Sequence, residues 1–183
     1  MRVARRIITP LFAVALGLVM CGLALRIYMG REAEDHLASG EAVSIATLRS
    51  PLPRPSFLAC PPGYCSAAEA VASPVFGMPS DRLHAFWMEI ISHEKRLVPV
   101  AADPDSGRFV YIEHSPTFRF SDIITVEFAR LSADRSSIAL CRRSRYGEYD
   151  LGKNRKRVER WLVLLQTVAR PAIPPGTSIK VRG

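Results

Sequence analysis

The chain has 183 residues, of which 48% are apolar and 23% charged, so it is long enough for one ordinary domain with an additional segment. The apolar fraction excludes a disordered chain, and fourteen prolines without a regular period exclude a collagen-like one. Four cysteines are too few for a disulfide scaffold, and the formal net charge is +8.

The positive charge is concentrated at the two ends of the sequence. Residues 1–31 carry +5, residues 142–160 carry another +5, and residues 161–183 add +3. Residues 32–141 carry −5. The middle of the chain is therefore mildly acidic, and the basicity is local rather than spread over one nucleic-acid-binding face.

The first basic segment surrounds 19 uncharged residues, from Ile7 to Leu25. A helix of that length reaches about 28 Å, close to the apolar thickness of a bilayer, and the preceding arginines favour a cytoplasmic N-terminus. We therefore expect residues 1–31 to form a cytoplasmic tip and a transmembrane signal anchor. This predicts a single-pass membrane protein whose domain is extracytoplasmic, or periplasmic in a Gram-negative bacterium. A cleaved signal peptide and a lipid anchor on Cys21 are the alternatives.

A proline-spaced stretch follows, and it predicts an extended linker. We expect residues 32–56 to be a stalk and residues 57–183 to be the folded domain. Near the start of that domain, Cys60 and Cys65 flank a Pro-Pro-Gly turn that brings the two thiols close together. An oxidising compartment permits a disulfide there, whereas a reducing one favours free thiols. A metal site needs further ligands, and we expect neither a metal nor a cofactor.

Two amphipathic helices and four strands are predicted in the domain. Ser80 is a suitable N-cap for the first helix, whose apolar stripe is Leu83, Phe86, Trp87, Ile90 and Ile91. Strand patterns cover Leu97–Ala101, Arg108–His114, Ile123–Leu131 and Ser137–Arg143. The last helix has an apolar face made of Val158, Trp161, Leu162, Leu165 and Val168. The predicted fold class is α+β, with an N-terminal transmembrane helix and a four-stranded antiparallel sheet flanked by two amphipathic helices.

The second basic segment leaves the last predicted strand and enters the last helix. Its cations crowd the first turns of the helix, where the helix dipole favours acidic side chains instead. Three explanations are open. The first is a bound anion that offsets the repulsion between these cations and the helix dipole, since free backbone N–H groups and cations together suit phosphate or carboxylate. Internal pairing is the second, with Asp122, Glu148, Asp150 or Glu159, and a solvated basic face is the third.

The same segment contains the run Ser144-Arg145-Tyr-Gly-x-Tyr-Asp150-Leu-Gly-x-Asn154-Arg155-Lys-Arg157. This run resembles the signature of the domain-of-unknown-function family 1499, in which a similar run precedes the final helix. Phe120-Ser-Asp122 and the Cys60–Cys65 segment resemble two further features of that family. The resemblance covers about residues 57–170. It implies a small domain that is often membrane-attached or exported, and it implies no activity.

We expect a non-enzymatic binding module for an anionic ligand, a lipid headgroup or an envelope protein partner, and no nucleic-acid binding. The expected ligand-binding residues are Asp122, Arg145, Asp150, Asn154, Arg155 and Arg157. A structural protein of an envelope complex is the alternative. A hydrolase-type enzyme is a further one, for which His114, Asp122, Ser144 and Asp150 offer the chemistry, although no nucleophile elbow or zinc-protease motif is present.

Overall fold

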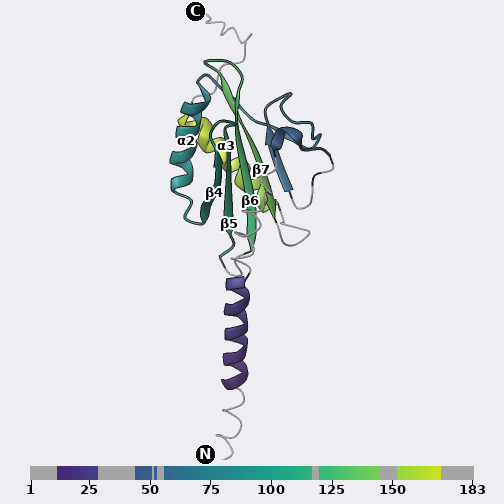
Figure 1. Ribbon diagram of the computed structural model, residues 1–183, viewed down its shortest axis with the longest axis vertical. Helices are drawn as coiled ribbons and strands as arrows, with labels where there is room; N and C mark the ends of the chain where they lie inside the picture. Colours follow the sequence, from purple (N-terminus) through teal and green to yellow (C-terminus); the bar gives the residue numbers. More distant parts are fainter. Residues whose placement is uncertain are drawn as a thin grey trace, which may run out of the picture.

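The computed structural model describes residues 12–28, 44–50, 52, 56–116, 120–144 and 152–169. Its main body is one twisted sheet with helices on one face (Figure 1). The elements in chain order are η1 (Ile45–Thr47), β1 (Ser56–Cys60), β2 (Val71–Ala72), β3 (Val75–Phe76), α2 (Ser80–Ser92), β4 (Leu97–Asp103), β5 (Arg108–His114), β6 (Ser121–Arg130), β7 (Ser136–Ser144) and α3 (Lys153–Val168).

The sheet has seven strands in the order β2-β1-β7-β6-β5-β4, and β3 also pairs with β7. Strands β4 to β7 form an antiparallel meander, and β1 joins β7 antiparallel. The pair β1–β2 is parallel, so the sheet is mixed. The prediction of a four-stranded antiparallel sheet is therefore wrong. The three added strands have five residues or fewer, which is too short for an alternating pattern to identify them.

The main core lies between the sheet and the two helices, α2 and α3. Trp87 of α2 and Trp161 of α3 are fully buried and meet edge to face, with ring centroids 5.6 Å apart. Such a pair contributes about 0.5–1.5 kcal/mol beyond its buried area. Both helices appear where their apolar stripes predicted them, although α2 begins at Ser80 itself and its N-cap is Pro79.

The opposite face of the sheet is partly covered by the N-terminal segment of the domain. Ile45 of η1 packs there against Leu58 and Cys60 of β1. Its backbone N–H donates to Oε1 of the buried Glu127, and Tyr64 donates to the second oxygen of the same carboxylate. One buried acid of β6 therefore fixes two segments that precede the central strands.

The transmembrane prediction for residues 1–31 is wrong. Within the described ranges, residues 12–28 are helical. In the described part of the chain, no helix is long and apolar enough to span a membrane. The predicted location, a single-pass membrane protein with an extracytoplasmic domain, is corrected on the same finding. The predicted boundaries after residues 31 and 56 stay predictions.

Candidate functional site

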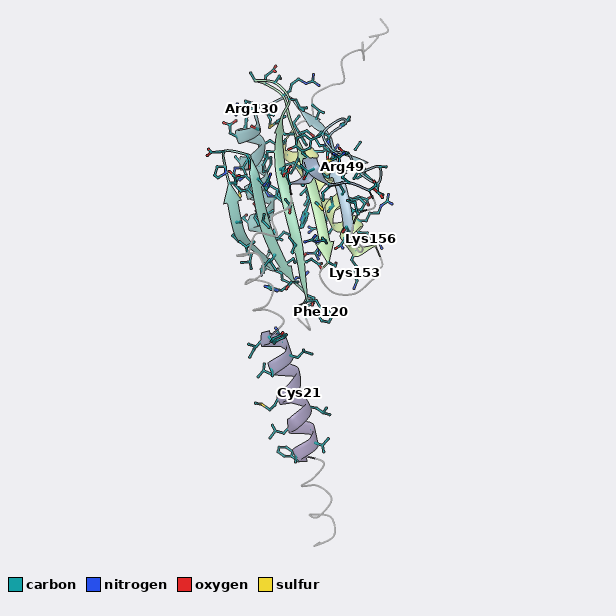
Figure 2. All side chains as sticks on the ribbon, turned by 45° about the vertical axis from the view of Figure 1, so that its right-hand side comes forward. Cys21, Arg49, Phe120, Arg130, Lys153 and Lys156 are labelled. Atoms are coloured by element: carbon teal, nitrogen blue, oxygen red, sulfur yellow. A yellow bond between two sulfur atoms is a disulfide. The ribbon has the colours of Figure 1, made fainter. Side chains whose placement is uncertain are left out.

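A cavity of about 670 Å³ opens where α3 begins, beside the end of β7 and the start of β6. We call it the basic cavity, since six cations and three carboxylates are among its lining residues. The cations are Arg96, Arg142, Lys153, Lys156, Arg157 and Arg160, and the carboxylates are Glu94, Glu113 and Asp122. Three positive charges are therefore in excess. Figure 2 shows Lys153, Lys156 and Phe120, which lines the same cavity, toward one end of the sheet.

Arg142 is the buried centre of the cavity. Its Nη1 lies 2.7 Å from Oε2 of Glu113, and its Nη2 donates to Oδ2 of Asp122 at 2.6 Å. Side chains on adjacent antiparallel strands meet when their residues share a face, and these three belong to β7, β5 and β6. The guanidinium also lies 6.0 Å from the ring centroid of Trp161, within cation–π range.

Two further arginines approach Glu113 from other elements. Arg157 of α3 forms an ion pair with Oε1 of Glu113, and Nη2 of Arg96 lies 3.4 Å from the same oxygen. Burial lowers the pKa of Arg157, and the positive charges of Arg96 and Arg160 lower it further, against an opposing effect of Glu94. One buried carboxylate thus organises three guanidinium groups around the cavity.

Glu94 forms a second ion pair at the edge of the cavity. It pairs with Arg160 and accepts a hydrogen bond from Nε1 of Trp161 at 2.9 Å. Burial alone raises the pKa of Glu94, but the hydrogen bonds from Trp161 and Arg160 outweigh burial and leave the pKa lowered. Glu94 is therefore ionised and already neutralised by protein groups near pH 7.

The positive charge of Arg142 is compensated by Glu113 and Asp122, but its hydrogen-bonding capacity is not fully used. Its side chain is 5% exposed, and neither Nε nor Nη1 donates a hydrogen bond to any described residue. The 2.7 Å approach of Nη1 to Glu113 is an ionic contact without hydrogen-bond geometry. A buried donor left unpaired costs about 1–3 kcal/mol, so an acceptor entering the cavity would recover this energy.

The N-terminus of α3 adds further positive potential. Gly152 is the N-cap residue just before α3 and has φ 73°, a left-handed conformation that suits glycine, and the first turn of the helix has no acidic residue. Lys153 and Lys156 are exposed there, and neither forms an ion pair with a carboxylate of the described segments. Asn154 is buried and donates to the hydroxyl of Ser144 at 3.0 Å, which joins α3 to β7.

Three of the predicted site residues line this cavity: Asp122, Asn154 and Arg157. Arg155 does not. Its Nε pairs with Glu159 one turn along α3 at 2.8 Å, and its guanidinium lies over the ring of Phe57. Internal pairing, one of the three explanations for the basic segment, therefore holds for Arg155. The two remaining candidates, Arg145 and Asp150, lie outside the described residues.

The sequence reasoning missed Glu113 and Arg142, which form the buried centre of the site. Glu113 was predicted only as a member of a strand, and Arg142 as the end of a strand and the first residue of the basic segment, without a role in binding. A signal for them was available, because Glu113 follows Tyr111 by two residues and Arg142 follows Leu140 by two, on a face whose other members are apolar. Charges at core-facing positions are rare unless they are paired.

Two other predicted groups lie away from this cavity. Cys60 and Cys65 form a disulfide, with Cα atoms 6.1 Å apart.

The contact between Ser121 and His114 is the second group. Oγ of Ser121 lies 3.2 Å from Nδ1 of His114, and both residues are buried. Successive strand residues point to opposite faces of a sheet, and the neighbours Asp122 and Glu113 line the cavity, so Ser121 and His114 lie on the other face. Within the described ranges, no group of three or more His, Cys, Asp or Glu side chains is placed to hold a metal ion.

Comparison with known proteins finds one family. The model of the family described as "Protein of unknown function (DUF1499)" matches residues 57–165, which is more than half of the chain. The matched segment runs from β1 to the last turns of α3 and includes every lining residue of the basic cavity. No curated protein matches the chain.

Proposed function

The chain belongs to the DUF1499 family of proteins of unknown function, and we propose that its domain is a binding module for a small anionic ligand. The observation that carries this proposal is the excess of three positive charges around one cavity, with the buried Arg142 at its centre. A phosphate or carboxylate group fits because planar guanidinium donors match its oxygens, and because a helix N-terminus adds N–H groups.

The charges divide into two classes with different roles. Arg142 and Arg157 are held by Glu113, so they stay in place whether or not a ligand is bound. Lys153 and Lys156 are exposed and have no such partner within the described segments, so they are available to an incoming anion. The buried pairs form a preorganised floor, and the two lysines make the contacts whose loss should affect binding most directly.

The experiment is a calorimetric titration of the full chain with inorganic phosphate at low ionic strength. We expect saturable binding that weakens as salt is added, because the interacting charges at the mouth are exposed. A Lys153→Ala and Lys156→Ala double variant should bind at least about tenfold more weakly, since charge-assisted hydrogen bonds contribute about 1.5–3 kcal/mol each.

Arg155→Ala is the matched control. It removes one positive charge from the same helix turn, but Arg155 pairs with Glu159 and does not line the cavity. Phosphate affinity should therefore stay within about twofold of the unaltered chain, because the charge of Arg155 is already paired with Glu159 and makes no contact with the cavity. Absence of saturable phosphate binding, or an equal loss in Arg155→Ala and the lysine variant, would overturn the proposal.

A further inference from the structure

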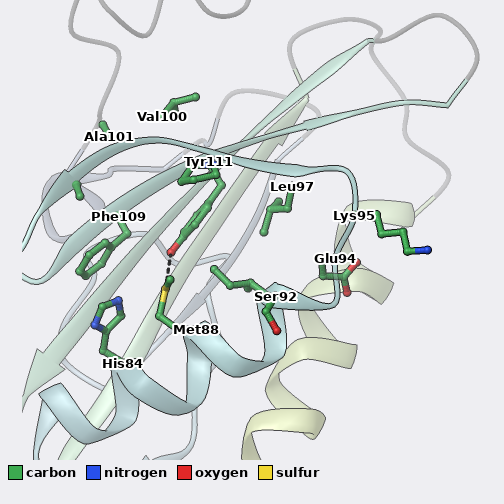
Figure 3. A pocket seen from close by; sticks show the side chains of 13 residues that line it. His84, Met88, Ser92, Glu94, Lys95, Leu97, Val100, Ala101, Phe109 and Tyr111 are labelled. Atoms are coloured by element: carbon green, nitrogen blue, oxygen red, sulfur yellow. Dashed lines mark hydrogen bonds between the residues drawn. The ribbon is translucent and has the colours of Figure 1, made fainter.

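A second cavity, of about 680 Å³, lies between α2 and the edge strand β4 (Figure 3). We call it the apolar groove, because Met88, Leu97, Phe109 and Tyr111 are among its lining residues. Met88 of α2 is a large apolar side chain that is 45% exposed where it lines the groove. A groove of this size is within the range that holds a small organic ligand.

Tyr111 and His84 are uncharged polar side chains of the groove near pH 7, and the charged Glu94 and Lys95 line it where α2 turns into β4. Tyr111 accepts a hydrogen bond from Nε1 of Trp87 at 3.2 Å and donates to the sulfur of Met88 at 3.8 Å, and burial raises its pKa. His84 stacks on Phe109 with ring centroids 4.1 Å apart, and burial lowers its pKa. The floor of the groove therefore suits hydrocarbon rather than an ion.

The apolar groove meets the basic cavity at Glu94. This residue lines both, at the turn that joins α2 to β4. The next residue, Lys95, lines the groove, and Arg96 lines the basic cavity. Because Glu94 is already paired with Arg160 and Trp161, the junction places no free negative charge in the way of an anion. The surface thus changes from apolar to cationic across one short turn.

We infer that the ligand is a single-chain amphiphile with an anionic headgroup. The headgroup occupies the basic cavity, and the hydrocarbon chain passes Glu94 into the apolar groove. This inference rests on the proposed function, which assigns the anion site, and adds the chemistry of the remainder of the ligand. The positive charges of the basic cavity favour the anionic headgroup, and the apolar side chains of the groove favour the hydrocarbon chain.

The test compares three probes on the full chain by calorimetry: inorganic phosphate, dodecyl phosphate and dodecyl maltoside, the two dodecyl compounds below their critical micelle concentrations. Burial of each methylene contributes about 0.8 kcal/mol, so a chain that is even partly enclosed should strengthen binding about 100-fold or more over phosphate. Dodecyl maltoside has the chain without the charge, and it should bind much more weakly than dodecyl phosphate.

Two variants of α2 locate the chain. Met88→Glu places a carboxylate in the groove and should remove the gain of dodecyl phosphate over phosphate, while phosphate itself binds as before. Ala85→Glu adds the same charge at an exposed position that does not line the groove, and both affinities should stay unchanged.

Each of the other possible results contradicts either the inference, the placement of the ligand or the proposed function. If phosphate binds and dodecyl phosphate binds no tighter, the inference fails and the proposed function stands. If dodecyl maltoside binds as tightly as dodecyl phosphate, or if Met88→Glu leaves the gain intact, the placement of headgroup or chain is wrong. If neither phosphate nor dodecyl phosphate binds, the proposed function and the inference fail together.

Discussion

Nη1 of Arg142 lies 2.7 Å from Oε2 of Glu113, and each of the two side chains is only 5% exposed. The pair joins two strands, β7 and β5, that are separated in the sheet by β6. Asp122 of β6 completes the contact with Arg142 from between them. An ion pair placed across three strands makes the shape of the basic cavity depend on the register of the whole meander.

Replacement of Arg142 should strongly destabilise the domain. Arg142→Met leaves the carboxylates of Glu113 and Asp122 without their buried partner, and breaking a buried ion pair costs about 3–5 kcal/mol. Urea unfolding followed by tryptophan fluorescence measures the loss. Combining Arg142→Met with Asp122→Asn should recover part of it, because Arg142 is the one ion-pair partner of Asp122 among the described residues, whereas Glu113 keeps Arg157 and Arg96. A single variant that loses less than about 1 kcal/mol would contradict this account.

The buried carboxylate on the other face should matter in a similar way. Glu127 is 2% exposed and accepts from Ile45, Tyr64 and Arg108, the last at 2.7 Å. Glu127→Gln removes the charge and one acceptor oxygen, so we expect the free energy of unfolding to fall by about 2–3 kcal/mol.

Tyr64→Phe is the comparison for this prediction, since it removes only one of the hydrogen bonds to Glu127. Its expected loss is about 1 kcal/mol, measured by the same urea transitions. Equal losses in the two variants would show that the tyrosine contact alone explains the effect, against the expectation that the carboxylate links all three partners.

Much of the α+β body follows from patterns in the sequence. Both domain helices and the four long strands lie where periodicity placed them, because each has at least seven residues and one consistently apolar face. Strands β2 and β3 have two residues each, and only pairing with distant partners makes them strands. Tertiary contacts of this kind leave no local pattern to find.

The candidate site likewise has residues that the sequence predicts and residues that only the fold reveals. Asn154 and Arg157 were predicted because they belong to a basic run that is visible along the chain, and both line the cavity. Glu113 stands alone in an apolar strand, Arg142 is the first residue of the basic run, and only the register of β5, β6 and β7 brings the two together. Arg155 belongs to the same basic run, but its position on the helix directs it to Glu159. Charge density along a chain therefore located the cavity but not its buried centre.

The disulfide predicts a definite labelling pattern. Cys60 and Cys65 are bonded, whereas Cys21 and Cys141 are free. Denatured but unreduced chain should take up two iodoacetamide labels, at Cys21 and Cys141, and reduction should raise the number to four. Mass spectrometry of the peptides assigns the sites. Label on Cys60 without reductant would contradict the pairing.

Reduction of the same bond should lower the free energy of unfolding modestly. The closed loop is short, so the chain-entropy model gives a loss of about 2 kcal/mol. Urea midpoints with and without reductant measure it. Cys141→Ser, which leaves the disulfide intact, should show the same response to reductant as the unaltered chain, because the bond is the group that changes.

His84 should make the domain less stable as the pH falls below neutrality. Burial beside Phe109 lowers its folded pKa from 6.5, so in this range the unfolded chain binds the proton more tightly. The stabilising contribution is fully present above pH 6.5 and is lost as the pH falls through the folded pKa. Urea midpoints between about pH 7.5 and 5.5 measure the slope. His84→Phe keeps a ring against Phe109 and His84→Gln does not, yet both remove the titrating group. Both variants should therefore flatten the profile, and an unchanged slope in both would contradict the role of His84.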